Sequence, residues 1–174
     1  MRETIRYGFI LAVICIVASG LLAGMNSLTK ARIIAQAQAE ENSALIEVMP
    51  QAKHFEPIRK GEEIIYYKVR DKNNKFIGVA FKASGKGYSS VVDTLVGMTQ
   101  DGTITAIKIL NQNETPGLGV RIAEPSFTGQ FNNKNLQGLS EVQAITGATI
   151  SSKAVIDSVK KKAQEIKDLI KNEK

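Results

Sequence analysis

The longest apolar stretch of the chain lies near its N-terminus. Residues 7–25 contain no charged side chain. A helix rises about 1.5 Å per residue, so this stretch would span about 28 Å, close to the roughly 30 Å thickness of a membrane's hydrocarbon core. We therefore expect residues 1–26 to form an N-terminal transmembrane anchor.

A cleaved signal peptide is the alternative interpretation, since Arg2 and Arg6 supply a basic leader. The apolar run is longer than the usual core of a signal peptide, however, and no clear Ala-x-Ala cleavage site follows it. Cys15 lies inside the run and not at its end, where it could accept a lipid. We favour a retained anchor. Its orientation does not follow from the basic residues, because Lys30 and Arg32 balance the two arginines on the other side.

The segment after the anchor predicts a helix of a different kind. Residues 27–48 are rich in good helix formers, and Pro50 ends the run. We expect residues 27–50 to form a helical stalk that joins the anchor to residues 51–174. That remainder is long enough for one compact domain.

Alternation of apolar and polar positions predicts strands in the first half of this domain. The last two predicted strands are separated only by Asp101-Gly102, the two-residue link favoured in a type I′ hairpin. Consecutive strands with short links indicate an antiparallel sheet. The predicted strands are Glu63–Arg70, Phe76–Ala83, Val91–Gln100 and Thr103–Leu110.

Helical spacing returns at the C-terminal end. A helix is predicted from about Ser152 to Lys171, and its apolar residues would face the sheet. Between the sheet and this helix we expect a loop over Asn111–Gly119, short helical or irregular pieces over Val120–Phe131 and a polar loop over Asn132–Leu139. The predicted fold class is α+β, an antiparallel sheet with packed helices. The apolar helix positions are Val155, Val159, Ala163, Ile166 and Ile170.

The amino-acid composition excludes several kinds of site and partner. Cys15 is the only cysteine and His54 the only histidine, which excludes an internal disulfide and a Cys- or His-rich metal site. We expect His54 to lie in a surface loop between Pro50 and Pro57. The net charge of +6 does not indicate a nucleic-acid partner, because the lysines of residues 153–174 alternate with acidic residues, as on a solvated helix face.

The richest cluster of hydroxyl groups stands at the entry to the terminal helix, in Thr-Gly-Ala-Thr-Ile-Ser-Ser, residues 146–152. The first turn of a helix leaves N–H groups unpaired and carries partial positive charge, so it stabilises a phosphate. Gly147 and Ala148 let a ligand approach the backbone closely. From spacing alone, an ordinary N-cap by Ser151 or Ser152 is the simpler interpretation.

The same seven residues resemble the flavinylation signature of the FMN-binding domains of Rnf-type complexes and of the Na⁺-translocating NADH:quinone reductase. In that signature Ser/Thr-Gly-Ala-Thr/Ser is followed, two residues on, by Ser/Thr, and the second hydroxyl residue bears FMN through a phosphoester bond. The resemblance implies FMN on Thr149. Position 143, where the family usually has an acidic residue, is Gln143 here. The other residues implied at this part of the site are Thr146, Gly147, Ala148 and Ser151.

A second segment, Glu-Thr-Pro-Gly-Leu-Gly at residues 114–119, is similar to the family's loop against the bound flavin. A plain turn is the alternative, since Pro-Gly dipeptides form turns routinely. Glu114 is expected to brace the loop as a hydrogen-bond acceptor and not to protonate the flavin. Residues 85–88 fit the family's glycine-rich segment, in which Tyr88 either stacks on the flavin ring or covers the hairpin. The loop residues implied at the cofactor are Glu114, Thr115, Gly117, Leu118 and Gly119.

The order of these parts matches the family along nearly the whole chain, and its short length resembles the G subunit of Rnf complexes. The resemblance implies a non-autonomous oxidoreductase subunit, a translocase component with no catalytic residues of its own. It implies single-pass insertion in a prokaryotic inner membrane, with the FMN domain extracytoplasmic and loaded there by an FMN transferase. Electrons would pass between this flavin and other membrane, iron–sulfur or flavin subunits, on a path that links ferredoxin and NAD⁺ and accompanies ion movement.

Two functions of other classes compete with this one. A membrane-tethered binding or assembly module without redox chemistry would be colourless and would tolerate Thr149→Ala. A secreted enzyme that uses Thr149 or Ser152 as a nucleophile is the weakest alternative, because no Ser-His-Asp set is apparent.

Overall fold

The computed structural model describes residues 2–172 of the chain. Contacts divide the chain into two compact units, which meet between Glu40 and Glu41. The helix α1 (Arg2–Val48) runs through the first unit and into the second. One continuous helix therefore covers both the predicted anchor and the predicted stalk, and it ends two residues before Pro50.

In the first unit, α1 presents apolar side chains to its surroundings. An 18-residue window of this helix is long and apolar enough to cross a membrane, and none of that window is buried within the structure. Ile16, Leu21 and Leu22 are each about 70 % exposed. An apolar helix that packs against no protein is typical of a membrane-spanning segment.

The second unit is built on a five-stranded antiparallel sheet in which every strand pairs with its neighbour in sequence, in the order β1-β2-β3-β4-β5. All four predicted strands are confirmed, and β2 has the predicted bounds. The strands are β1 (His54–Lys60), β2 (Glu63–Arg70), β3 (Phe76–Lys86), β4 (Val91–Thr99) and β5 (Ile104–Asn111).

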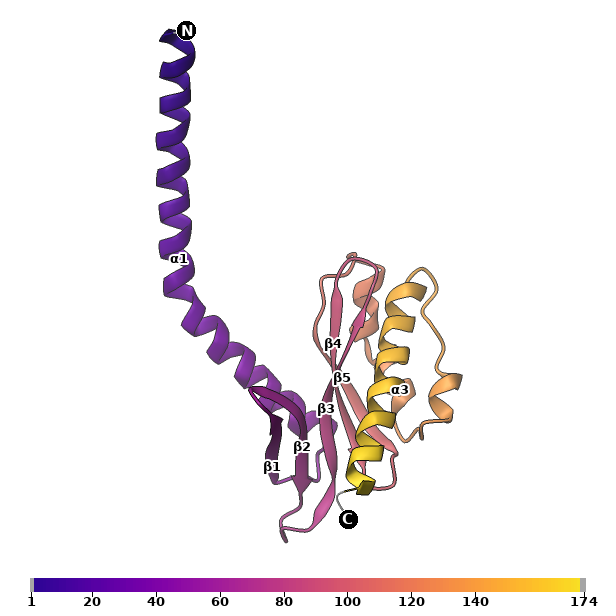
Figure 1. The fold of residues 1–174 in the computed structure, drawn as a ribbon. Helices are drawn as coiled ribbons and strands as arrows, with labels where there is room; N and C mark the ends of the chain where they lie inside the picture. The colour runs from indigo at the N-terminus through magenta and orange to yellow at the C-terminus, as the bar shows by residue number, and fades with distance from the viewer. Residues whose placement is uncertain (1, 173–174) are drawn as a thin grey trace. The chain divides into compact units, whose positions relative to one another are not determined.

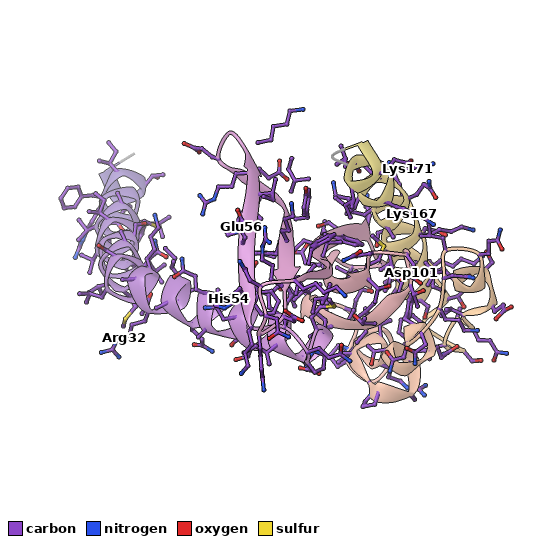
Figure 2. All side chains as sticks on the ribbon, turned by 90° about the horizontal axis from the view of Figure 1, so that it is seen from below. Arg32, His54, Glu56, Asp101, Lys167 and Lys171 are labelled. Atoms are coloured by element: carbon purple, nitrogen blue, oxygen red, sulfur yellow. The ribbon has the colours of Figure 1, made fainter. Side chains whose placement is uncertain are left out.

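The first strand was not predicted. The expectation that His54 lies in a loop is wrong, because His54 begins β1, where its side chain is exposed. Figure 2 shows His54 and Glu56 on this strand. β1 pairs only with β2, and only Phe55 and Ile58 are half-buried, so its sequence carries little alternation. Pro57 is tolerated there because an edge strand need not donate every backbone N–H group.

The hairpin between β4 and β5 also differs from the prediction. Gly102 has φ of +89°, but Asp101 is not among the residues with positive φ. A type I′ turn needs positive φ at both residues, so that prediction is wrong. The Gly102 N–H group donates to the Thr99 carbonyl (3.1 Å), and the Thr99 N–H group donates to Thr103 (2.9 Å). The link is a three-residue loop whose glycine takes the left-handed conformation.

Both faces of the sheet are covered. Figure 1 shows α3 (Thr149–Asn172) along one face. Of its five predicted sheet-facing residues, Ile170 is partly buried and the other four are fully buried, so that prediction is confirmed. The short segments between β5 and α3 complete this core, where Phe127 and Phe131 make an edge-to-face contact with ring centres 5.5 Å apart. These segments are η1 (Gly119–Ala123), α2 (Pro125–Thr128), η2 (Gly129–Phe131) and η3 (Gly138–Glu141).

The other face is covered by the last two turns of α1. Leu45, Val48 and Met49 are buried there, and they form one cluster with apolar residues of β2, β3 and β4. The close approach requires Gly97 of β4, where an added Cβ would lie 2.5 Å from the Val48 carbonyl oxygen. The Glu41 carboxylate accepts a hydrogen bond from the Tyr67 hydroxyl (2.8 Å), and burial, together with this bond, raises the pKa of Tyr67 to about 12. The architecture is α+β, as predicted.

Candidate functional site

A cleft of about 530 Å³ opens where three segments of the second unit meet. Its size falls within the range of about 300–1,000 Å³ that is typical of small-molecule sites. The segments are the link between β3 and β4, the loop after β5 and the first turn of α3. The lining residues are Tyr88, Glu114, Thr115, Leu118, Gly119, Gly147, Ala148, Thr149, Ile150 and Ser151.

All but two of the residues that the sequence analysis implied at the cofactor line this cleft. Thr146 and Gly117 are exposed and do not line the cleft. Gly117 has φ of +75°, and Gly147 has φ of +83°. Both glycines therefore shape the turns that lead into the site, and Gly147 in addition lies against Leu118.

Ile150 lines the cleft and was missed by the sequence analysis. Its side chain is 56 % exposed. The helix was expected to begin at Ser152, whereas α3 begins at Thr149, so Ile150 belongs to its first turn. One signal was available, since Ile150 is the only large apolar residue within the hydroxyl-rich segment.

Glu114 is the centre of the site's hydrogen-bond network. Its carboxylate is 5 % exposed. It accepts hydrogen bonds from the backbone N–H groups of Tyr88 (3.2 Å), Ser89 (3.1 Å) and Ser90 (3.0 Å). The Ser151 hydroxyl donates to it over 2.5 Å. These contacts confirm that Glu114 braces the loop as an acceptor.

The ionisation of Glu114 follows from these donors. Burial on its own raises the pKa of the carboxyl group, but the hydrogen bonds from Ser151 and from the backbone of residues 88–90 outweigh it. The pKa therefore lies below its ordinary value of 4.5. No cation lies within ion-pair distance of this carboxylate in residues 2–172. Glu114 is thus a buried negative charge satisfied by neutral donors.

Two glycines make room for this carboxylate. An added Cβ at Gly87 would lie 2.6 Å from Oε1 of Glu114. An added Cβ at Gly119 would lie 2.6 Å from the Glu114 Cβ and 2.9 Å from its Oε2. A side chain at either position would therefore displace the Glu114 carboxylate or the segments around it.

The start of α3 is not capped as the simpler interpretation expected. Ser151 donates to Glu114, and the Ser152 hydroxyl accepts from the N–H group of Ile145 (3.1 Å). The prediction that Ser151 or Ser152 bonds the amides of the first turn is therefore wrong. These amides have no intrahelical acceptor, and with the helix dipole they favour an anion. Thr149, the first residue of the helix, is exposed beside them.

The rim of the cleft is apolar. Tyr88, Leu118 and Ile150 are 70 %, 48 % and 56 % exposed. Flat aromatic ligands bury well against such side chains, while the helix start suits a phosphate at the other end of the ligand. The cleft therefore fits an aromatic nucleotide.

A larger cavity of about 860 Å³ lies between β2, β3 and the C-terminal half of α3. Its lining carries charges of both signs, of which Lys82 pairs with Glu41 (2.7 Å) and Lys162 with Glu165 (3.0 Å). The charged residues of the lining are four lysines and four glutamates, so the cavity as a whole favours neither sign of ligand, and the smaller cleft is the better candidate. Within residues 2–172, no three His, Cys, Asp or Glu side chains gather as metal ligands.

Gln143, which stands where the resembling family usually has an acidic residue, is exposed. Its backbone N–H group donates to the side-chain oxygen of Gln130 (2.9 Å), and its carbonyl accepts from the side-chain amide of Gln130 (3.4 Å). Both bonds connect Gln143 to Gln130, which does not line the cleft.

Comparisons with known proteins agree with this geometry. A family model described as "FMN-binding domain" matches residues 87–164, which include every residue that lines the cleft. A second, described as "RnfG N-terminal region", matches residues 1–48 and thus the whole of α1.

Similar proteins match over nearly their full length. The chain is 34 % identical to the G subunit of the ion-translocating oxidoreductase complex of Methanosarcina acetivorans, over 91 % of this chain and 92 % of that protein. It is 33 % identical to the G subunit of the Na⁺-translocating ferredoxin:NAD⁺ oxidoreductase complex of Acetobacterium woodii, over 98 % and 95 %. The crystal structure of NqrC from Shewanella oneidensis has the same fold, with a TM-score of 0.54 at 21 % identity over 72 % of this chain and 74 % of that one.

Proposed function

The chain belongs to the RnfG family, the G subunits of ion-translocating oxidoreductase complexes, and on this premise we propose that it carries FMN as a phosphoester of Thr149 and relays electrons through it. It is an FMN-binding subunit of an oxidoreductase complex, with a helix suited to membrane anchoring. The covalent bond, its position and the ion-translocating activity are the parts that we propose.

The observation that carries the assignment to Thr149 is the state of the hydroxyl groups in residues 146–152. Ser151 and Ser152 are buried and already hydrogen-bonded. Thr146 is exposed but lies outside the cleft. Thr149 alone among the four is exposed and lines the cleft, at a helix start that favours a phosphate.

Attachment at Thr149 needs an activated donor, because FMN itself offers no good leaving group. With a flavin dinucleotide, the bond from the Thr149 oxygen to the flavin's phosphorus forms and the phosphoanhydride bond breaks. The departing mononucleotide takes the hydroxyl proton. A separate FMN transferase would carry out this step, since none of the residues that line the cleft is a free base. The protein gains the mass of one FMN less one water.

The residues of the cleft fit the two ends of the cofactor. The first-turn amides of α3 would hold the phosphate, while Tyr88, Leu118 and Ile150 would bury one side of the flavin ring and limit its contact with water. FMN supplies the one- and two-electron chemistry when bound. A covalent bond removes dissociation, so the relay stays occupied even on an open site.

The relatives suggest the surrounding complex. Those from Clostridium ljungdahlii and Acetobacterium woodii are named as components of proton- and Na⁺-translocating ferredoxin:NAD⁺ oxidoreductase complexes. We propose that this chain likewise works with other membrane, iron–sulfur and flavin subunits on a path between ferredoxin and NAD⁺. Residues 1–26 would span the inner membrane among its lipids, residues 27–50 would form the stalk, and residues 51–174 would bind FMN outside the cytoplasm.

The attachment is tested by producing the protein together with its transferase and then denaturing it. We expect flavin fluorescence to remain with the wild-type chain and with Thr146→Ala, and to be absent from Thr149→Ala. Flavin fluorescence that remains with the denatured Thr149→Ala protein would show that the ester is formed at another hydroxyl group. A colourless wild-type protein would favour the tethered binding module instead.

The orientation is tested with reporters fused after Lys174. An alkaline phosphatase fusion should be active and a cytoplasm-dependent fluorescent fusion dark. The opposite pattern would place the domain in the cytoplasm and overturn the proposed topology.

A further inference from the structure

We propose that Glu114 and Ser151 are positioning residues for flavin attachment: their hydrogen bond holds the first turn of α3 against the 114–119 loop and so presents the Thr149 hydroxyl to the cleft. The inference rests on the proposed function, since it concerns the bond made at Thr149. Neither side chain takes part in that bond. Both act through the geometry of the residue that does.

One carboxylate connects three segments of the cleft. Oε1 of Glu114 accepts from the N–H groups of Ser89 and Ser90, at 3.1 and 3.0 Å. Oε2 accepts from the Tyr88 N–H group at 3.2 Å and from the Ser151 hydroxyl at 2.5 Å. The link between β3 and β4, the loop after β5 and the start of α3 therefore share a single anchor.

The hydrogen bond of Ser151 also affects the direction in which Thr149 points. Successive residues of a helix are rotated by about 100°, so the side chains of Thr149 and Ser151 leave α3 in different directions, although both line the cleft at its start. Ser151 is 2 % exposed and faces Glu114, whereas Thr149 is exposed at the cleft. The first turn of a helix is its least constrained part, because its amides lack intrahelical acceptors. The hydrogen bond to Ser151 thus sets the rotation of the turn that carries Thr149.

Simple core packing does not account for the contact between Glu114 and Ser151. A buried carboxylate is more costly than an apolar side chain of similar size unless its acceptors are satisfied. Glu114 meets no cation among the described residues, and an added Cβ at Gly87 or at Gly119 would lie 2.6 Å from its atoms. Stability alone would favour an apolar contact at this place. A carboxylate that connects three segments instead fixes the positions of these segments relative to one another.

The test compares the rate of FMN loading with stability in full-length protein in detergent. Purified, unloaded wild-type, Ser151→Ala and Glu114→Gln proteins are incubated with FMN transferase and a flavin dinucleotide, and attached flavin is followed over time. We expect both variants to load at least about tenfold more slowly at saturating acceptor, since a misplacement of 1 Å can cost about 100-fold in rate. The acceptor concentration at half-maximal rate should stay within about twofold, because both substituted side chains are almost fully buried and offer a transferase little surface to contact.

Ser152→Ala is the matched control. Ser152 is also fully buried on the first turns of α3, but its hydroxyl accepts from Ile145 and does not contact Glu114. We expect it to lower the unfolding temperature as much as Ser151→Ala does and still to load at the wild-type rate. Protein that is irreversibly misfolded would lower the final amplitude at an unchanged rate, and circular dichroism of each variant before loading measures the folded fraction, which separates lost structure from lost positioning.

Each outcome decides the question. Loading that slows in Ser151→Ala and Glu114→Gln but not in Ser152→Ala supports the inference. Equal rates in all four proteins, or rates that follow stability across all three variants, overturn it while leaving the proposed function intact. Wild-type protein that never accepts flavin contradicts the proposed function, and the inference with it.

Discussion

Gly119 shows at the scale of one residue how tightly the cleft is built. An added Cβ would lie 2.6 Å from the Glu114 Cβ, too close for any real contact. We expect Gly119→Ala to lower the free energy of unfolding by about 1–3 kcal/mol, the usual cost of overpacking, and to open the cleft. Chemical denaturation measures this change.

Gly129→Ala is the control for that substitution. Nothing lies within 4 Å of an added Cβ at Gly129, whose φ of −63° suits alanine. Its effect should stay within about 0.5 kcal/mol of zero. If Gly119→Ala were equally neutral, the close approach to Glu114 would not exist in solution.

The Glu114 carboxyl group predicts a dependence of stability on pH. Its pKa in the folded protein is lowered from 4.5, since hydrogen bonds from Ser151 and residues 88–90 exceed the effect of burial. A lowered pKa stabilises the fold fully above the unfolded value, and this contribution is lost as the pH falls from about 4.5 through the folded value. Glu114→Gln should therefore lose stability at neutral pH and show a flatter decline in acid.

The comparison is made by denaturation at a series of pH values from neutral to below 4.5. Glu62→Gln provides the control, because Glu62 is exposed in the link between β1 and β2. A decline in acid that is as steep in Glu114→Gln as in the wild type would mean that Glu114 is not the ionised acceptor described here.

At the scale of elements, α1 combines two environments in one helix. Its N-terminal part exposes apolar residues, whereas Leu45 near its end is 3 % exposed within the cluster on the sheet. We expect Leu45→Ala to cost about 2–5 kcal/mol of unfolding free energy, as deletions in a buried core do. The neighbouring Ile46 is 59 % exposed, so Ile46→Ala should be nearly neutral. Equal effects of the two would mean that the helix end does not pack on the sheet.

The elements that could be predicted are those in which the spacing of apolar residues matches the face that is buried. Strand β2 and the sheet-facing positions of α3 carry clear periodicity, and both were predicted correctly. β1 was not predicted, because an edge strand with few half-buried residues shows little alternation of apolar and polar positions, and because proline is more common in loops than in strands. The hairpin turn was misjudged because Asp-Gly fits two loop lengths, and only the hydrogen bonds of Thr99 distinguish them.

The site was predictable to a similar extent. The motif around Thr149 and the 114–119 loop indicated most of the residues that line the cleft. The hydrogen bond between Glu114 and Ser151 could not be predicted, because it joins positions that are 37 residues apart in the sequence. Ile150 was missed for a local reason, since a helix that starts three residues early changes which side chains face the cleft.

At the scale of the whole molecule, the boundary between the two units has a measurable consequence. Protein beginning at Glu41 retains the buried end of α1, whereas protein beginning at Gln51 loses Ala44, Leu45, Val48 and Met49. The first should be soluble and unfold cooperatively. The second should aggregate or unfold at a lower temperature, because one face of the sheet becomes an exposed apolar patch. Equal stability of the two would place the boundary nearer to residue 51.

The account as a whole depends on the bond between Thr149 and the flavin's phosphorus. The most direct measurement is the mass of the intact, denatured protein produced with its transferase, followed by fragmentation of the peptide that contains residues 146–152. We predict a gain of one FMN less one water, with the added mass on Thr149. An unmodified Thr149 in a cell that loads other flavoproteins of this kind would contradict the account.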